Sequence, residues 1–213
     1  MAAFANAGSG GIVRDIAATI VEQKAYLSEI DGKIGDGDHG VNMAKGFGRA
    51  AERIGNDASL SDAMATLSDV LMNEIGGSMG PLYGMLFMEM GEAIENDETI
   101  DASAFARMMR AGLEGVSSVG SAAVGDKTMM DALVPATLAC EEAAARGEPL
   151  DAVLAATKRA AEEGRDATLD MVAKIGRASR LGERSRGVLD AGATSCAMII
   201  AGLCDGARAR ASG

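Results

Sequence analysis

Aromatic side chains are scarce in this chain. Trp is absent, and Phe and Tyr together make up 3% of its 213 residues. The apolar residues nevertheless reach 48%, so the core must be built mainly from Ala, Leu, Ile, Val and 14 Met. Because Ala, Leu and Met favour helices and only three Pro interrupt the chain, we expect an all-α domain with a sizeable core.

A basic surface is also lacking, because the formal net charge is −11. Proteins that bind nucleic acid normally carry a basic patch, and the nearest equivalent here is the Arg-rich stretch from Arg177 to Arg186. We therefore expect neither nucleic acid nor an anionic membrane surface as a partner. The excess of carboxylates instead favours metal cations as ligands.

Cysteine is rare, with three residues at positions without paired spacing, Cys140, Cys196 and Cys204. This number and spacing exclude a disulfide framework and a zinc site, and they predict buried free thiols in a reducing compartment. The N-terminus shows no basic region followed by an apolar one. The most apolar stretch, Ala191 to Leu203, is too short to span a bilayer. We expect a cytoplasmic protein.

Apolar residues recur at three- and four-residue steps along most of the chain, and alternating patterns typical of strands are scarce. Glycine, proline and capping residues divide this pattern into eight helical segments. The expected helices cover about residues 11–30, 41–54, 60–75, 82–94, 101–119, 129–146, 150–174 and 193–209. No repeat or low-complexity linker intervenes, so we expect residues 1–213 to form a single domain, with about 1–8 and 207–213 as disordered tails.

The most informative loop is residues 31–40, which holds three Asp and four Gly. The carboxylates of Asp31, Asp36 and Asp38 would repel one another if they converged, and a divalent cation between them would relieve that repulsion. Magnesium takes about six oxygen ligands, often including phosphate oxygens. The glycines would let the backbone fold tightly enough for convergence. The loop thus predicts a magnesium site that also anchors a polyphosphate.

Other interpretations of this loop compete. The spacing Gly35-x-Gly37-x-x-Gly40 matches the dinucleotide-binding fingerprint, but a helix rather than a strand precedes it, and its Asp residues would repel a pyrophosphate lacking metal. An EF-hand fails because Gly40 and Phe47 stand where oxygen ligands are needed. A solvated acidic turn that caps the next helix remains an alternative on spacing alone. His39, the only histidine, fits either a surface position or a phosphate contact.

Two further loops carry groups suited to phosphate. Residues 76–80 open an expected helix, where successive backbone N–H groups can form an anion site. Residues 176–187 contain several Arg, whose guanidinium groups pair well with phosphate. Residues 76–80 could instead be an ordinary helix–helix turn, and residues 176–187 could be a solvated basic loop. Taken together, metal ligands, anion-binding backbone and cationic side chains favour phosphoryl transfer, and the absence of a Gly-x4-Gly-Lys-Ser/Thr sequence excludes a P-loop NTPase.

Several of these stretches resemble the L subunit of dihydroxyacetone kinases, which also occurs fused as the C-terminal domain of ATP-dependent enzymes. The matching stretches, in the family's order and spacing, are IGDGDHGVNM (34–43), GGSMGPLYG (76–84), VGDKTMMDALVPA (124–136), GRASRLGERSRG (176–187) and DAGATS (190–195). The resemblance implies a barrel of eight antiparallel helices with the nucleotide site at one end. The helix count agrees with the one expected from periodicity.

The resemblance also implies site residues. ADP or ATP would bind with two magnesium ions that join its phosphates to Asp31, Asp36 and Asp38, and these carboxylates and Arg177 would act as electrostatic catalysts. The nucleotide-binding positions implied are His39, Gly40, Val41, Asn42, Gly77, Ser78, Met79, Gly120, Thr128, Met129, Arg177, Asp190, Ala191 and Gly192.

The implied activity is that of a kinase subunit that is inactive without its partner. A separate K subunit would hold dihydroxyacetone or a related small ketose, and this chain would deliver the phosphoryl group to it. A phosphotransferase-system protein as the phosphoryl donor and a homodimer are further expectations, and exchangeable ATP is the alternative donor. Other functions that fit are the nucleotide-binding subunit of a ketotetrose or fatty acid kinase, and an ADP-bound regulatory subunit.

Overall fold

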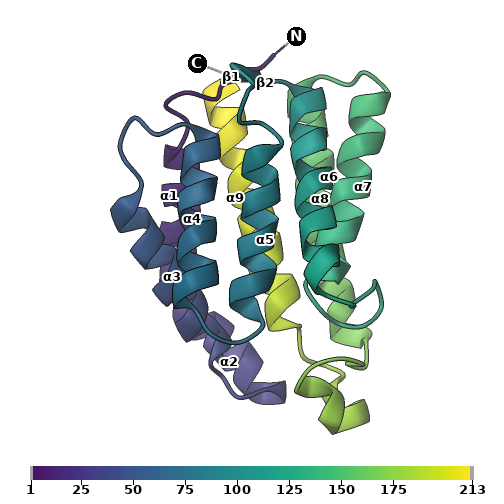
Figure 1. Ribbon diagram of the computed structural model, residues 1–213. Coiled ribbons are helices and arrows are strands. Elements are labelled where there is room, and N and C mark those ends of the chain that lie inside the picture. The colour runs from purple at the N-terminus through teal and green to yellow at the C-terminus, as the bar shows by residue number, and fades with distance from the viewer. Residues whose placement is uncertain (1, 212–213) are drawn as a thin grey trace.

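The structure is a computed structural model that describes residues 2–211. Helices dominate it, as the composition predicts (Figure 1). The α-helices are α1 (Gly11–Glu22), α2 (Lys24–Ile34), α3 (His39–Arg53), α4 (Leu60–Glu74), α5 (Met79–Glu92), α6 (Ala102–Val119), α7 (Met130–Ala145), α8 (Leu150–Ala167) and α9 (Ala191–Ala211). Two 3-10 helices, η1 (Thr168–Asp170) and η2 (Ala178–Ser185), connect α8 to α9.

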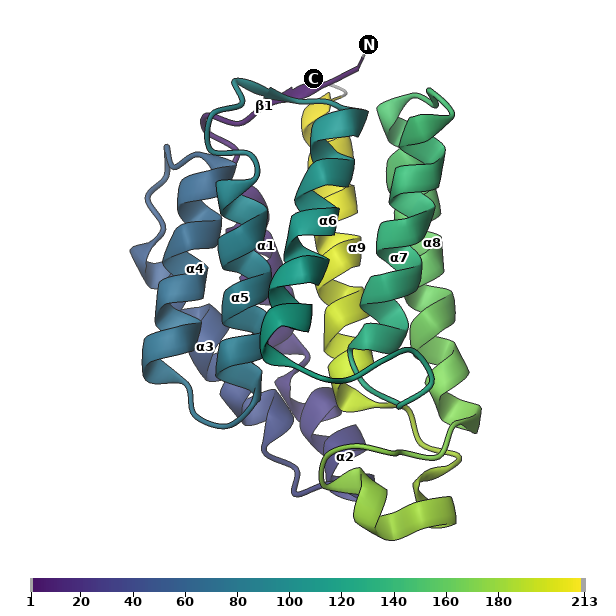
Figure 2. The ribbon, with the colours of Figure 1, turned by 45° about the vertical axis from the view of Figure 1, so that its right-hand side comes forward.

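Eight long helices pack in a closed series. If the short helix α2 is left aside, each helix contacts the next one along the chain, from α1 and α3 through to α9. The last helix, α9, contacts α1, so these eight helices form a closed ring. Helices that are neighbours in this ring run in opposite directions (Figures 1 and 2). Their apolar sides meet in one core, where the rings of Phe47 and Phe87 pack edge to face with centroids 5.9 Å apart. The predicted all-α class is confirmed.

The first predicted helix, residues 11–30, is in fact two helices. Gln23 separates them with φ −84° and ψ 6°, outside the helical region. The shorter second helix, α2, then packs against α3 and also touches α9 and η2. No glycine or proline lies at this break, so the apolar periodicity predicted one continuous helix. The consequence for the site is that α2 carries Asp31 to the lower end of the ring in Figure 1.

The predicted helix 150–174 ends earlier, at Ala167. Thr168 redirects the chain: its hydroxyl donates to the Arg165 carbonyl at 2.6 Å and accepts the Asp190 N–H at 3.0 Å. Side-chain hydrogen bonds of this kind compete with helix continuation. Residues 168–190 therefore form an irregular connection at the same end of the ring as α2 (Figure 2).

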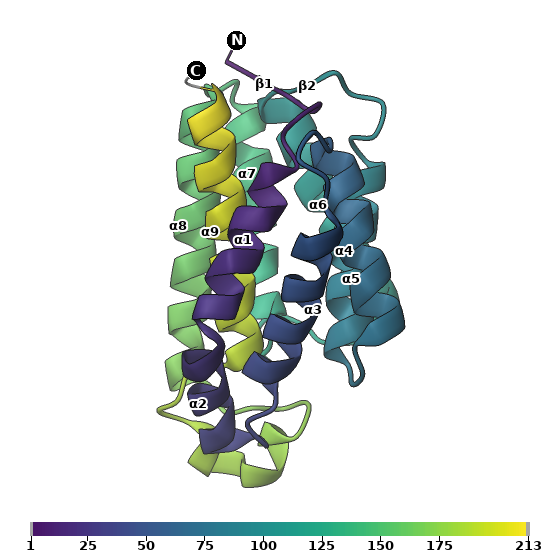
Figure 3. The same ribbon diagram turned by 90° about the vertical axis from the view of Figure 1, so that its left-hand side faces the viewer.

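The two ends of the chain lie together at the opposite end of the ring (Figure 3). Strand β1 (Phe4–Ala5) pairs antiparallel with β2 (Thr99–Ile100), and α9 continues to Ala211. Parts of the expected tails 1–8 and 207–213 are thus in regular structure, and residues 1, 212 and 213 lie outside the described residues. Over residues 2–211, no helix has the length and apolar character needed to cross a membrane. The three cysteines are free and buried, as predicted.

Candidate functional site

A cleft of about 650 Å³ opens at the end of the ring that carries α2 and η2. Its walls come from the α2–α3 loop, the α4–α5 loop, the end of α6, the α6–α7 loop, the start of η2 and the start of α9. Among them are the loops at residues 31–40, 76–80 and 176–187, which the sequence analysis identified as suited to metal or phosphate. The volume lies in the range typical of small-ligand sites.

Three carboxylates stand at this cleft. Asp31 lies near the end of α2, and Asp36 and Asp38 lie in the loop before α3. One oxygen atom from each lies within 4.8 Å of the other two. Glycines allow the tight turn, because Gly37 has φ 77° and a Cβ on Gly35 would lie 2.5 Å from Asp31 Oδ1. The convergence predicted from the sequence is found, and such a group of oxygens fits magnesium.

A cationic side chain approaches the same carboxylates. Arg177, directly before η2, pairs through Nη1 with Asp36, and the same atom lies 3.5 Å from Asp38 Oδ2. The three side chains are 45–56% exposed, so water weakens these ion pairs. The carboxylates nevertheless attract positive charge from a distant part of the chain. This is the electrostatic property that a magnesium site requires.

His39 begins α3 and joins several elements through hydrogen bonds. Its backbone N–H donates to Asp31 Oδ2 at 3.2 Å, and its Nε2 lies 2.9 Å from Ser195 Oγ. Ser195 Oγ lies 2.7 Å from the Tyr83 hydroxyl, which also lies 3.0 Å from the Gly192 carbonyl oxygen. Burial lowers the pKa of His39, against the opposing charge of Asp31. The imidazole is therefore neutral at pH 7, with its ring held by α9.

Asp190 lies at the start of α9 and also lines the cleft. Its Oδ2 accepts the N–H of Ala193 at 2.7 Å, which caps the helix. Burial raises the pKa of Asp190 to about 7, and the negative charges of Asp131 and Asp31 add to this effect. The Ala193 N–H and the Lys127 ammonium oppose it. Asp190 is thus a carboxyl group whose charge changes near neutral pH.

Asp131 was not identified from the sequence as a site residue. It is 1% exposed, and its two carboxylate oxygens accept the backbone N–H groups of Gly125 at 2.6 Å and Thr128 at 2.7 Å. These bonds shape the α6–α7 loop, which forms one wall of the cleft. The available signal was an Asp in the first turn of a predicted helix, directly after a glycine-containing turn.

Lys127 was also not identified from the sequence as a site residue. Its side chain is buried, and Nζ donates to the carbonyl oxygens of Met171 at 3.1 Å, Ser185 at 2.6 Å and Val188 at 2.6 Å. Burial lowers the pKa of this lysine, while Asp190 acts in the opposite direction. Lys127 thus links the α6–α7 loop to the connection between α8 and α9.

Most of the predicted nucleotide-binding residues line the cleft. These are His39, Asn42, Gly77, Ser78, Met79, Gly120, Thr128, Met129, Arg177, Asp190, Ala191 and Gly192. Gly40 and Val41 lie outside its lining. Gly40 is buried between α2 and α3, where a Cβ would overlap the Lys24 carbonyl oxygen, and Val41 is 45% exposed. The first turn of α3 points these two residues away from the cleft.

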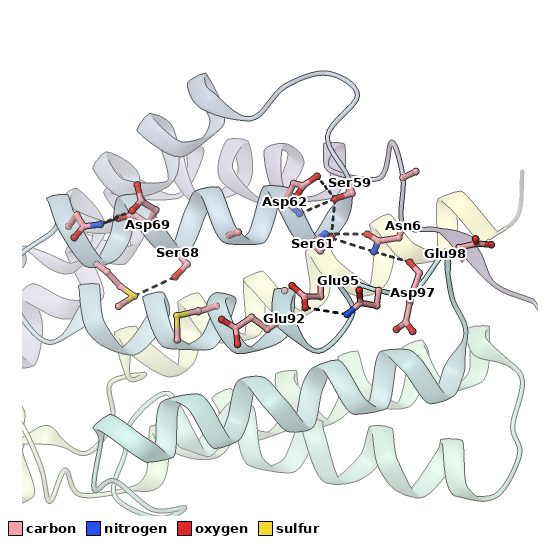
Figure 4. A pocket seen from close by; sticks show the side chains of 17 residues that line it. Asn6, Ser59, Ser61, Asp62, Ser68, Asp69, Glu92, Glu95, Asp97 and Glu98 are labelled. Carbon is pink, nitrogen blue, oxygen red and sulfur yellow. Dashed lines mark hydrogen bonds between the residues drawn. The ribbon is translucent and has the colours of Figure 1, made fainter.

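A second, larger cleft of about 830 Å³ lies between α4 and α5, beside the N-terminal segment (Figure 4). Its lining includes the carboxylates of Asp62, Asp69, Glu92, Glu95, Asp97 and Glu98. Among the described residues that line it there is no Lys or Arg. Such a surface repels phosphate groups. For a phosphorylated ligand, the smaller cleft is therefore the better site.

Known proteins are similar to this chain in sequence. A family model described as the DAK2 domain matches residues 33–205. The ADP-binding subunit DhaL of PEP-dependent dihydroxyacetone kinase 1 from Listeria innocua is 38% identical over 190 residues, covering 88% of this chain and 90% of that protein. The ADP-binding subunit DhaL of the PTS-dependent dihydroxyacetone kinase from Lactococcus lactis is 38% identical over 183 residues, covering 85% and 87%.

A solved structure extends the likeness to the fold. The dihydroxyacetone kinase from C. freundii, in complex with AMP-PNP and Mg2+, matches with a TM-score of 0.65 at 27% identity. The match covers 92% of this chain and 33% of that one, so this chain spans about a third of the larger protein. Since the family model and relatives match over most of its length, the chain belongs to the DAK2 domain family, together with the DhaL subunits of dihydroxyacetone kinases.

Proposed function

We propose that this chain is the nucleotide-binding subunit of a dihydroxyacetone-type kinase. It holds ADP or ATP with magnesium and delivers a phosphoryl group to dihydroxyacetone, or a related small ketose, on a separate K subunit. The observation that carries this proposal is the convergence of Asp31, Asp36 and Asp38, with Arg177 beside them, at a cleft of about 650 Å³. The relatives named as ADP-binding subunits of such kinases support it.

The three carboxylates would hold the magnesium, for which we propose two ions. Bound magnesium neutralises charge on phosphate oxygens and so lowers the cost of phosphoryl transfer. The donor set suits this metal, because all three side chains offer hard oxygen ligands and none offers nitrogen or sulfur. Arg177 adds a positive charge on the same side of the cleft.

The remaining walls of the cleft suit the other parts of a nucleotide. Gly77 and Ser78 stand at the start of α5, where free backbone N–H groups favour a phosphate. Met129 and Leu82 supply apolar surface for the adenine ring. His39, neutral and tied to α9, presents a polar side chain next to the carboxylates without adding a full charge. Binding and orientation are therefore the contributions we assign to the chain.

If this chain binds the nucleotide, a partner must hold the substrate. The K subunit must approach the open end of the cleft, because the transferred group has to reach a substrate that this chain does not hold. For the phosphoryl donor we propose a phosphotransferase-system protein, since the two similar subunits are named for PEP-dependent and PTS-dependent kinases. We place the subunit in the cytoplasm, where its three free thiols would remain reduced.

Calorimetry of ADP binding tests the proposal. Asp36→Ala removes one of the three carboxylates and is expected to weaken magnesium-dependent ADP binding at least about a hundredfold, because the remaining pair holds the metal poorly. The helical circular dichroism should not change, since Asp36 is 45% exposed and outside the core. Asp69→Ala, in the acidic cleft on α4, removes the same charge and serves as the control. Unchanged ADP binding by Asp36→Ala would refute the assignment.

A further inference from the structure

Residues 171–188, which we call the arginine segment, form one wall of the cleft through residues 175–178 and bury very little hydrophobic surface. The segment connects η1 to α9 and contains Arg177, the cation beside the carboxylates. Only Ala173 and Ser185 of its residues are buried, and the others are partly or largely exposed. Burial of so little apolar area cannot offset the entropy lost when a connection of this length is ordered. Polar contacts must therefore hold the segment in place.

The main polar contact comes from Lys127 in the α6–α7 loop, which lies directly against the arginine segment (Figure 2). Its ammonium group donates one hydrogen bond to the first residue of the segment, Met171, and one each to Ser185 and Val188 near its end. An ammonium has three N–H donors, so all of them are used. Both ends of the segment are thereby hydrogen-bonded to the same atom, Lys127 Nζ.

The backbone at Lys127 points to the same role. Its φ is +64°, and within residues 2–211 it is the one non-glycine residue with a positive value. This conformation costs an L-residue about 1 kcal/mol, which glycine would avoid. Asp131 holds the turn in this shape through the N–H groups of Gly125 and Thr128. A lysine in a position suited to glycine is explained by what its side chain binds.

Other links between the loop and the segment are weaker. The Lys174 ammonium lies 3.5 Å from Asp126 Oδ1, but the Lys174 side chain is 63% exposed. Exposed ion pairs of this kind contribute little. The Lys174 N–H also donates to the Asp126 carbonyl at 3.2 Å. The two lysines thus touch the same part of the structure, one buried with three acceptors and one in water, and they form a matched pair for experiment.

We infer that Lys127 is a positioning residue: it clamps the arginine segment against the side of the cleft and so sets Arg177 beside Asp36 and Asp38. Without the ammonium, the three carbonyl groups lose their common partner and the segment detaches, while the ring of helices, whose hydrophobic core cluster includes none of its residues, remains folded. The clamp itself is a property of the free chain. Its effect on nucleotide binding rests on the function proposed above.

An arginine-specific protease tests the clamp without any nucleotide. The segment contains four target sites, Arg177, Arg180, Arg184 and Arg186. Lys127→Met should increase the rate of cleavage at these sites at least about tenfold, since a factor of ten corresponds to the loss of only one charged hydrogen bond of the three, with no change in helical circular dichroism. Lys174→Met, which removes the same charge, should leave the rate within about twofold. Equal cleavage rates in the two variants would overturn the inference.

A double-mutant cycle then asks whether Lys127 acts through Arg177. Lys127→Met should weaken magnesium-dependent ADP binding about tenfold in the natural sequence and less than about twofold in an Arg177→Ala background, because coupled residues are not additive. Additive losses would overturn this part of the inference, since a general loss of structure would add to the loss of Arg177. If neither the natural chain nor any variant binds ADP, the proposed function is wrong. The protease result would still show whether Lys127 holds the arginine segment in place. Should Lys127→Met not fold, Lys127→Gln, which keeps N–H donors without the charge, replaces it in both measurements.

Discussion

Asp190 makes the stability of this protein depend on pH in an unusual direction. The ordinary pKa of an Asp side chain is 3.8, and burial raises that of Asp190 to about 7 in the folded chain. Because the folded pKa is the higher one, the folded state binds the proton more tightly than the unfolded state does. The free energy of unfolding contributed by this group is therefore fully present below pH 3.8 and falls as the pH rises towards 7.

The size of the effect follows from the shift. Each pKa unit corresponds to about 1.4 kcal/mol, so a rise of about three units corresponds to about 4 kcal/mol of lost stability above pH 7. Asp190→Asn avoids this loss, because the amide does not ionise and its oxygen can still accept the N–H of Ala193 at the start of α9. We expect the variant to match the natural protein near pH 4 and to exceed its stability by up to about 4 kcal/mol at pH 8.

Urea unfolding, followed by circular dichroism at several pH values between 4 and 8 without metal or nucleotide, measures this difference. Asp101→Asn is the matched control, because Asp101 caps α6 in the same way by accepting the N–H of Ala104 at 2.9 Å. A stability difference between Asp190→Asn and the natural protein that stays constant from pH 4 to pH 8 would refute the reasoning. Such a result would mean that Asp190 is not buried as a charged group.

Two further changes test the packing around the site. Gly40→Ala should cost about 2–3 kcal/mol and weaken ADP binding without changing a proposed metal ligand, because the new methyl overlaps the Lys24 carbonyl and forces α2 away from α3. Gly48→Ala, whose new methyl would come no closer than 3.6 Å to another helix, is the control in thermal unfolding and calorimetry, and equal behaviour of the two would contradict this. Tyr83→Phe should cost about 1–2 kcal/mol in urea unfolding, because the Ser195 hydroxyl loses a buried partner at 2.7 Å, and an unchanged stability would show that this bond contributes nothing.

Most of the helical architecture was readable from the chain, and the errors have local causes. Apolar periodicity located the helices because each buries one side in the core. It joined α1 to α2, since Gln23 carries no signal for a break, and it extended α8 past Ala167. There the partner that redirects Thr168 is Asp190, which lies 22 residues away. A contact at that separation leaves no trace in a pattern of three- and four-residue steps.

The predicted site residues likewise include some that the structure places at the cleft and some that it does not. Asp31, Asp36 and Asp38 were predicted because they lie within eight residues and only a tight turn is needed to bring them together. Gly40 and Val41 lie in the next stretch of chain but outside the cleft lining. They were predicted as site residues because they belong to the matching stretch 34–43. Which side of α3 faces the cleft depends on how α3 packs against α2.

By itself, the sequence determined the helical class, the cluster of three aspartates in one short loop and the family, because composition and short motifs depend only on residues close together in the chain. Only the tertiary structure decided which loops share a cleft, that burial holds Asp190 near a neutral pKa, and that Lys127 binds three carbonyl groups 44 to 61 residues away. Burial and hydrogen-bond partners are properties of the space around a residue. Chain segments that fold in from far along the sequence fill that space, so no local pattern records them.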